Sequence, residues 1–269
     1  MRSLLKFLNR ILPTPLKSLL TKTLGAALFY FGYKPKQFHN TLPLRKLLNT
    51  SFFDYYFYKT RRLNSEELNN KFWKEWGAKY LASFNQTPIP EYYLKEIENL
   101  IETKNVKTVF ELGCGFLRHL EHLANKYPHL ELYGVDITPE IVDHAKALNN
   151  PHIKVFVDDV RNIEKYRDIL KKAGLIFSYG IFAYLNPVDL EKVCGIIQKH
   201  FRGYVVYNDA SQKRDLSELI KSIKLSSQSY IHPYPKIFKK YGLEEISSGY
   251  SPDKESFNFI GKQHKKNRC

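Results

Sequence analysis

Two carboxylates and a glycine turn are the residues of this chain whose types and spacing suit chemistry. Glu111 lies in an apolar run and is followed by the turn Gly113-Cys114-Gly115, and Asp136 ends the next apolar run. Glycine lets a backbone turn sharply and approach a ligand with no Cβ in the way. A carboxylate in the place of Asp136 suits hydrogen bonds from the hydroxyl groups of a ribose. The pattern therefore predicts a nucleotide site.

The segment between the two carboxylates must position them. Apolar residues recur there at helical spacing, at Phe116, Leu120, Leu123, Ala124 and Tyr127. A strand, a glycine turn, a helix and a second strand make a βαβ unit, whose ligands bind at the carboxyl ends of the strands. The alternative is an ordinary buried βαβ unit in which the glycines only form a turn. Asp136 favours the nucleotide site.

A dinucleotide is the less suitable ligand. The dinucleotide fingerprint has a third glycine three residues after Gly115, where this chain has Arg118. The size and charge of Arg118 do not suit close packing of the helix near a pyrophosphate. Glu111 would lie near the bound group and suits a positively charged amine. The residues therefore argue against NAD.

Four segments in order resemble the motifs of class I S-adenosylmethionine-dependent methyltransferases. They are FELGCGFLRHL (110–120), YGVDITPEIVDHA (133–145), IKVFVDDV (153–160) and LIFSYGIFAYLNP (175–187). The resemblance implies that S-adenosylmethionine is the cofactor and S-adenosylhomocysteine the product. One departure is Leu117, where related families often have a third glycine.

The resemblance also implies which residues bind the cofactor. Asp136 takes the ribose-binding place, and Asp159 and Val160 lie beside adenine. The fourth segment is a strand that leads into a loop facing the methyl group. The expected cofactor-binding residues are Glu111, Gly113, Cys114, Gly115, Asp136, Ile137, Asp159, Val160, Ser178 and Tyr179.

Catalytic residues are expected after the fourth and fifth strands and in a cap. Methyl transfer from a sulfonium is a direct displacement, so the protein mainly positions the nucleophile and excludes water. A hydroxyl acceptor needs a base, whereas a neutral amine needs little beyond a lone pair. The candidates are His232 and Tyr184, and the alternative for His232 is a loop histidine that bonds local backbone groups. Asp209 follows the fifth strand. His119 and His122 lie off the apolar face of their helix and are expected to be solvated.

The whole pattern predicts an α/β fold. Apolar runs near residues 106–112, 130–136, 152–158, 174–179 and 202–208 alternate with helical patterns. Two late segments, 242–247 and 257–261, have no full helix between them and suit an antiparallel hairpin. The expected architecture is Rossmann-like, with a seven-stranded, mostly parallel sheet, helices on both faces and an N-terminal helical extension or cap.

Positive charge is concentrated at the N-terminus of the 269-residue chain. The formal net charge is +15, and residues 1–62 hold twelve Lys or Arg and one acid. Three scattered cysteines form no metal spacing or disulfide framework, which suits a cytoplasmic protein that binds no metal. The expected parts are a basic amphipathic extension (1–62), a helical cap or linker (63–104), a methyltransferase domain (105–261) and a basic tail (262–269).

Residues 1–33 predict a segment that lies on an anionic membrane surface. The leucines lie on one face of a predicted helix, and Arg2, Lys6 and Arg10 lie on the rest of it. Burial of the apolar face and attraction of the basic residues to anionic lipids would both favour binding to the membrane. The uncharged stretch 24–33 is too short to cross a bilayer. The alternative is a helical lid packed on the domain. A nucleic-acid arm is less suitable because the segment is leucine-rich and its charges are not clustered.

These observations predict a methyltransferase that acts on a small-molecule or lipid- or glycan-linked acceptor at the inner, cytoplasmic face of the membrane. The loop Ser178-Tyr179-Gly180-Ile181 lacks the Asn/Asp-Pro-Pro-aromatic sequence of amino-methylating DNA enzymes. Cys194 lies in an amphipathic helix rather than in the Pro-Cys context of cytosine C5 enzymes. Two alternatives stay open: an RNA methyltransferase that uses the basic N-terminal arm, and a non-catalytic protein that binds S-adenosylmethionine.

Overall fold

The chain divides into two compact units, residues 1–87 and 88–269. The computed structural model describes residues 23–24, 26–27, 67, 71–75, 77–78, 89–224, 229–251 and 256–264. In the first unit, Phe72 and Trp73 are buried and their rings meet edge to face, with centroids 5.3 Å apart. Most of the predicted extension, membrane segment and cap helix, and the end of the tail, lie outside the described residues. Within the described part of the chain, no helix is long and apolar enough to span a bilayer.

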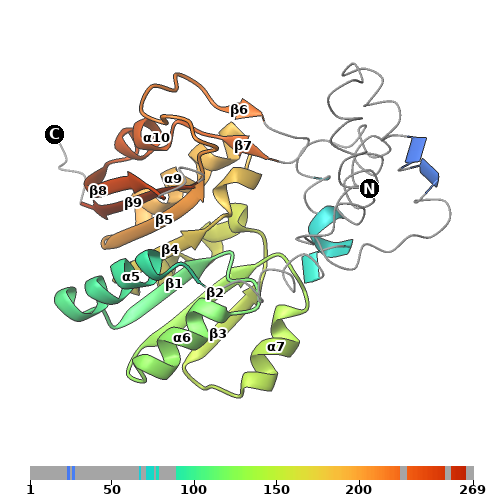
Figure 1. The fold of residues 1–269 in the computed structure, drawn as a ribbon. Helices are drawn as coiled ribbons and strands as arrows, with labels where there is room; N and C mark the ends of the chain where they lie inside the picture. The colour runs from blue at the N-terminus through green and yellow to red at the C-terminus, as the bar shows by residue number, and fades with distance from the viewer. Residues whose placement is uncertain are drawn as a thin grey trace. The chain divides into compact units, whose positions relative to one another are not determined.

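A seven-stranded sheet in the order β3-β2-β1-β4-β5-β9-β8 is the centre of the second unit (Figure 1). The first five strands pair in parallel, and β9 pairs antiparallel with both β5 and β8. The strands are β1 (Thr108–Leu112), β2 (Glu131–Asp136), β3 (Ile153–Val157), β4 (Leu175–Tyr179), β5 (Tyr204–Ala210), β8 (Leu243–Tyr250) and β9 (Ser256–Gln263). The predicted Rossmann-like fold with its late hairpin is confirmed.

Helices cover both faces of this sheet (Figure 1). One layer consists of α5 (Glu91–Lys104), α6 (Arg118–Lys126) and α7 (Ile141–Leu148). The other consists of α8 (Arg167–Lys172), α9 (Pro187–His200) and α10 (Tyr234–Lys240), with the 3-10 turns η1 (Val160–Tyr166) and η2 (Phe182–Tyr184). Neighbouring residues of a strand face opposite layers, so Val109 and Phe110 of β1 enter different core clusters and are both fully buried. Burial on both faces explains why the central strands are continuous apolar runs.

Two details of the second unit differ from the prediction. The strand β9 runs to Gln263, and Lys262 pairs with Tyr204, so the basic tail begins later than residue 262. A separate two-stranded sheet, β6 (Ile223–Lys224) and β7 (Tyr230–Ile231), was not predicted. Strands of two residues are too short to show an alternating pattern.

Candidate functional site

The glycine turn connects β1 to α6 at the carboxyl edge of the sheet. Gly113 and Gly115 have φ angles of 77° and 49°, in the left-handed region that glycine adopts without strain. The amides of Gly113 and Cys114 both donate to the carbonyl of Val135, at 2.8 and 3.2 Å. A Cβ atom at Gly113 would lie 2.0 Å from Cγ1 of Ile181. Only glycine at 113 therefore allows the loop after β4 to approach this turn.

Leu117 keeps the shape of the turn although it is not glycine. Its φ angle is 61°, so its backbone adopts the left-handed conformation that glycine would adopt there. That conformation costs about 1–2 kcal/mol for a residue with a side chain. The Leu117 side chain is fully buried in the core beneath α6, which offsets the cost.

Asp136 ties the end of β2 to the glycine turn. Its Oδ2 accepts a hydrogen bond from the amide of Gly115, and its Oδ1 accepts one from the amide of Thr138, both at 2.9 Å. Burial raises the pKa of the Asp136 carboxyl, and these two amides oppose that shift. A carboxylate has about four lone-pair sites, more than these two amides occupy. The residue fits the ribose-binding place that the resemblance implies.

Glu111 and His119 form a buried pair at the end of β1. Glu111 Oε1 lies 2.6 Å from His119 Nδ1, and both side chains are almost fully buried. Burial raises the pKa of the Glu111 carboxyl, whereas His119 lowers it. Among the described residues, Glu111 Oε2 and His119 Nε2 have no hydrogen-bond partner. A buried carboxylate oxygen without a partner suits the ammonium group of the methionine part of S-adenosylmethionine.

The prediction that His119 is solvated was wrong. Its ring packs among those of Tyr93, Phe177 and Tyr179, with centroid distances of 5.7, 5.9 and 5.6 Å. The carboxylate of Glu111 allows a polar ring to be buried there. His122, one turn later, is partly exposed and lies 2.8 Å from Glu98.

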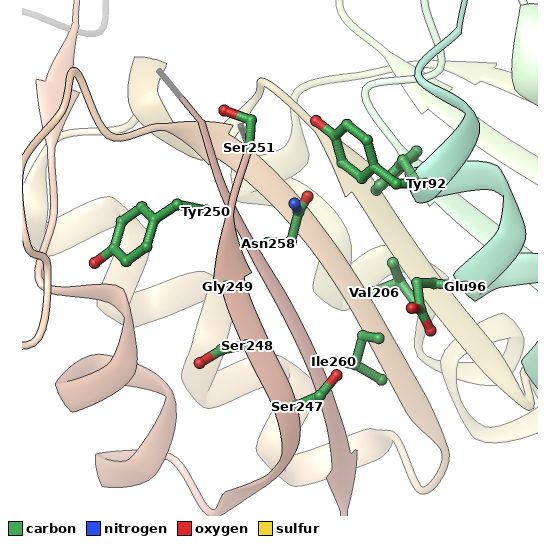
Figure 2. Close-up of a pocket in the computed structure, with 11 residues that line it drawn as sticks. Tyr92, Glu96, Val206, Ser247, Ser248, Gly249, Tyr250, Ser251, Asn258 and Ile260 are labelled. Carbon is green, nitrogen blue, oxygen red and sulfur yellow. The ribbon is translucent and has the colours of Figure 1, made fainter. Parts of the chain in front are cut away.

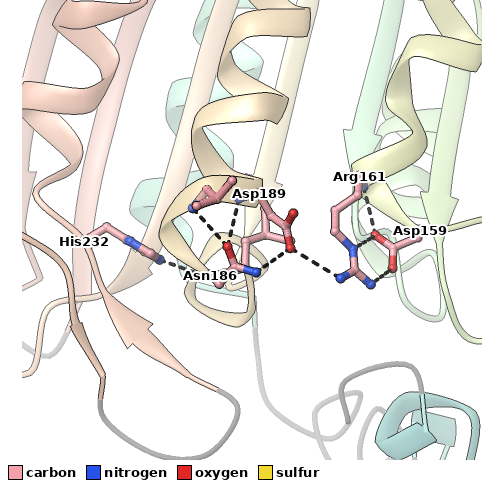
Figure 3. A network of polar contacts seen from close by, with 7 residues as sticks. Asp159, Arg161, Asn186, Asp189 and His232 are labelled. Atoms are coloured by element: carbon pink, nitrogen blue, oxygen red, sulfur yellow. Dashed lines mark hydrogen bonds and ion pairs between the residues drawn. The ribbon is translucent and has the colours of Figure 1, made fainter. Parts of the chain in front are cut away.

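The loop after β3 is held by a buried arginine that the sequence analysis missed (Figure 3). Asp159 accepts a hydrogen bond from the Arg161 amide at 2.9 Å, and its carboxylate also binds the Arg161 guanidinium. Nη1 of Arg161 lies 3.4 Å from Asp189, which in turn accepts from Asn186 at 2.7 Å. Asn186 caps α9 by accepting from two of its first amides. The expected adenine side of the site is therefore connected to the segment that follows β4.

The loop after β4 brings the remaining expected residues to the same edge. Ser178 is buried, and Tyr179 packs edge-on against Tyr93 with centroids 5.1 Å apart. The amide of Gly180 donates to the carbonyl of Asn208 in β5, at 2.8 Å. Tyr184 lies half-buried in η2. The expected cofactor residues thus meet at the carboxyl ends of four adjacent strands, β1 to β4.

His232 lies in the core rather than in an open cleft. Its Nε2 is 3.1 Å from the carbonyl of Leu185, and its Nδ1 is 2.7 Å from Oγ of Ser222. A carbonyl only accepts, so Nε2 carries the proton and Nδ1 accepts from Ser222. Burial lowers the pKa of His232 to about 4. With both nitrogens engaged, this geometry favours the alternative of a loop histidine that bonds local groups; the role of a base stays a prediction.

Asp209, near the end of β5, is another buried carboxyl group at this edge. Its two oxygens accept hydrogen bonds from the amides of Ala210 and Ala183, both at 2.8 Å. Burial raises its pKa to about 6, while these amides and the nearby hydroxyl groups of Tyr207 and Tyr234 oppose the shift. Its hydrogen bond to Ala183 holds η2, and with it Tyr184, against β5.

Comparison with known proteins agrees with this geometry. Residues 109–202 match the family described as a methyltransferase domain. The malonyl-[acyl-carrier protein] O-methyltransferase 1 of Ilyobacter polytropus is 24% identical over 127 residues, which are 46% of this chain. The chain spans only 44% of the length of that relative.

Solved structures share the fold at low sequence identity. A S-adenosylmethionine-dependent methyltransferase from Clostridium acetobutylicum has a TM-score of 0.50 at 14% identity, over 66% of this chain and 94% of that one. The 1,6-didemethyltoxoflavin-N1-methyltransferase of Burkholderia thailandensis has a TM-score of 0.50 at 12% identity, over 65% of this chain and 79% of that one. The family match shows a methyltransferase domain in residues 109–202, and the strand order agrees with the fold that the resemblance to class I S-adenosylmethionine-dependent methyltransferases implies.

Proposed function

We propose that this protein transfers a methyl group from S-adenosylmethionine to a small-molecule or lipid- or glycan-linked acceptor. The observation that carries the proposal is the meeting of Glu111, the glycine turn and Asp136 at one edge of the sheet. Glu111 offers a buried carboxylate oxygen that has no hydrogen-bond partner in the described part of the chain, and Asp136 offers lone pairs beside the turn. An ammonium group and a ribose are the ligand groups that these two carboxylates suit.

Each part of the edge has a separate task in this proposal. The bound cofactor supplies a methyl group that its sulfonium already activates. Glu111 attracts the ammonium group, Asp136 accepts from the ribose hydroxyl groups, and Asp159 with Val160 binds adenine. The Asp159–Arg161 pair fixes the orientation of the adenine side. These residues hold the methyl donor in place, which is the main contribution that a displacement requires from the protein.

The acceptor would approach across the loops that follow β4 and β5. Tyr184 is half-buried, so its hydroxyl group is the better placed of the two catalytic candidates, whereas His232 is enclosed. An amine acceptor would need neither residue as a base. The name of the Ilyobacter relative describes O-methylation of a malonyl group on an acyl-carrier protein, which supports a small acceptor group rather than a nucleic acid.

The place of action is the second part of the proposal. The charge pattern of residues 1–33 supports attachment to an anionic membrane surface at the inner face of the membrane. A lipid-linked acceptor would be presented at such a surface.

Calorimetric titration with S-adenosylmethionine and with S-adenosylhomocysteine tests the cofactor site. We expect saturable binding of each at one site, followed by transfer of labelled methyl groups into lipid or glycan extracts. If neither compound binds, the proposed function is wrong. If both bind but only RNA becomes labelled, the acceptor class is wrong.

A further inference from the structure

A groove of about 320 Å³ lies near the carboxyl edge of the sheet, on the face that α5 partly covers (Figure 2). Its floor is apolar and consists of Val206 of β5 and Ile260 of β9. One wall is α5, which contributes Tyr92 and Glu96, and the opposite wall is β8. The whole groove is formed by described residues of the second unit.

Small residues of β8 keep the groove open. Paired residues of neighbouring strands share a face, and Ser247 pairs with Ile260 while Gly249 pairs with Asn258. Ser247 and Gly249 therefore face the groove. A Cβ atom at Gly249 would have no atom within 4 Å, so this position borders open space. Ser248 also lines the groove, but its side chain points away from it (Figure 2), and its hydroxyl group donates to Glu245.

The groove begins next to the loop where the methyl group is expected. Nδ2 of Asn208 donates to Oδ1 of Asn258 at 2.5 Å and lies 3.5 Å from the hydroxyl group of Tyr92. The carbonyl of the same Asn208 accepts from Gly180, in the loop after β4. An acceptor whose reactive atom lies at that loop could extend along the groove by way of Asn208.

The chemistry of the walls selects among possible ligands. They present the hydroxyl groups of Tyr92 and Ser247, the amide of Asn258 and the carboxylate of Glu96 above an apolar floor. A sugar ring has hydroxyl groups around its rim and an apolar face that packs against aromatic and aliphatic side chains, so it matches both surfaces. An acyl chain would displace water from the Ser247 hydroxyl group and the Glu96 carboxylate without offering either of them a hydrogen bond. A phosphate would meet the carboxylate of Glu96 and no Lys or Arg among the described lining residues.

We propose that this groove binds a neutral sugar unit of the acceptor, which rests on the proposed function and narrows it to a glycan-containing substrate. The sugar would lie between Tyr92 and β8, with its hydroxyl groups bonded to Asn258, Ser247 and Glu96. The proposal is independent of whether the sugar is free or linked to a lipid.

Saturation-transfer NMR on the full-length protein tests the groove with three probes: methyl β-glucoside, octyl β-glucoside and 1-octanol. We expect both glucosides to bind with dissociation constants of about 1–10 mM, because ligands of few atoms gain limited binding energy. We expect no binding of 1-octanol. Equal affinity of the two glucosides indicates a free glycan, and tighter binding of octyl β-glucoside indicates a lipid-linked one.

Two variants of the same strand locate the binding. Gly249→Leu fills the groove and should weaken glucoside binding at least tenfold, whereas Ser248→Leu adds the same side chain on the other side and should leave it unchanged. Titration with S-adenosylhomocysteine shows whether each variant is folded. If Gly249→Leu no longer binds S-adenosylhomocysteine, the variant Ser247→Leu, which fills the same groove, replaces it in the experiment.

Each other outcome overturns the sugar site. It is wrong if neither glucoside binds the wild-type protein, if 1-octanol binds as well as octyl β-glucoside, or if filling the groove changes nothing. A wild-type protein that fails to bind S-adenosylhomocysteine would instead contradict the proposed function, so the two failures are distinguishable.

Discussion

Nδ1 of His119 lies 2.6 Å from Oε1 of Glu111, and this contact joins the first turn of α6 to the end of β1. A buried carboxyl group tends to take up a proton, because burial disfavours its charged form. His119 opposes that tendency by lowering the pKa of Glu111. In the proposed function, His119 is therefore a positioning residue that keeps the Glu111 carboxylate available for the ammonium group of the cofactor.

Replacing His119 should weaken the binding of the amino-acid part of the cofactor alone. In His119→Phe the ring packing is kept, but the Glu111 carboxyl loses its donor and its pKa rises. We expect the affinity for S-adenosylhomocysteine to fall about tenfold, a loss of about 1.4 kcal/mol. Binding of 5′-methylthioadenosine, which lacks the amino acid, should not change. Calorimetry of both ligands makes the comparison.

His122→Phe is the matched control for this experiment, since His122 lies on the same helix and contacts Glu98 instead. Its affinities for both ligands should equal those of the wild-type protein. An equal loss of both ligands in His119→Phe would contradict the assignment, because it would indicate a general disturbance of the turn.

Replacing Asp136 should weaken the binding of both S-adenosylhomocysteine and 5′-methylthioadenosine. Asp136→Asn keeps the shape of the side chain but removes the negative charge of the carboxylate, which is proposed to accept hydrogen bonds from the ribose hydroxyl groups. Both S-adenosylhomocysteine and 5′-methylthioadenosine contain this ribose. We expect each affinity to fall by about 1.5–3 kcal/mol, the range for a lost hydrogen bond to a charged group. The same calorimetric series measures it. Unchanged binding of 5′-methylthioadenosine would show that Asp136 holds only the glycine turn.

The strands and the glycine turn could be predicted because their signals are local. Central parallel strands are buried on both faces, so runs such as 108–112 stand out in the sequence. The turn needs glycine for a backbone reason that is visible in the sequence. The position of Asp136 could be predicted because the second apolar run ends on it, and the structure has it as the last residue of β2; its contact with a ribose stays a prediction.

The missed features depend on residues that are distant in the sequence. Helical spacing assigned His119 to the polar side, because that analysis cannot include the carboxylate that Glu111 supplies from the preceding strand. Arg161 has a local partner in Asp159, but its second carboxylate, Asp189, lies 28 residues later and could not be inferred from the local sequence. The groove joins Tyr92 of α5 to Gly249 of β8, and no local pattern relates those two positions.

The basic N-terminal segment should bind anionic membranes through its charges. The triple variant Arg2→Gln, Lys6→Gln and Arg10→Gln removes three positive charges, each worth about 1 kcal/mol near such a surface. We expect binding to phosphatidylserine vesicles in a sedimentation assay to weaken by about two orders of magnitude. The control variant Lys265→Gln, Lys266→Gln and Arg268→Gln changes the net charge equally and should still bind. Equal weakening by both variants would indicate attraction by net charge alone.

Asp209 should make the folded protein less stable as the pH rises from about 4 to about 6. Its pKa is raised from 3.8 to about 6 in the folded state, so the folded form binds the proton more tightly than the unfolded form. The stability that this gives is fully present below pH 3.8 and is lost as the pH rises through 6. A shift of about 2 units corresponds to about 3 kcal/mol. Denaturant unfolding of the wild type and of Asp209→Asn across this range should show that the free energy of unfolding of the wild type, relative to that of the variant, declines by about this amount as the pH rises.

His232 supplies the control for this measurement because its titration has the opposite sign. The pKa of His232 is lowered from 6.5 to about 4 in the folded state. The contribution of His232 to the free energy of unfolding is therefore fully present above pH 6.5 and is lost as the pH falls through 4. The two groups therefore offset each other in the wild-type protein between about pH 4 and 6. Relative to the wild type, Asp209→Asn should gain stability as the pH rises, and His232→Gln should lose it. A difference between the wild type and Asp209→Asn that does not vary with pH would show that Asp209 ionises at its ordinary pKa.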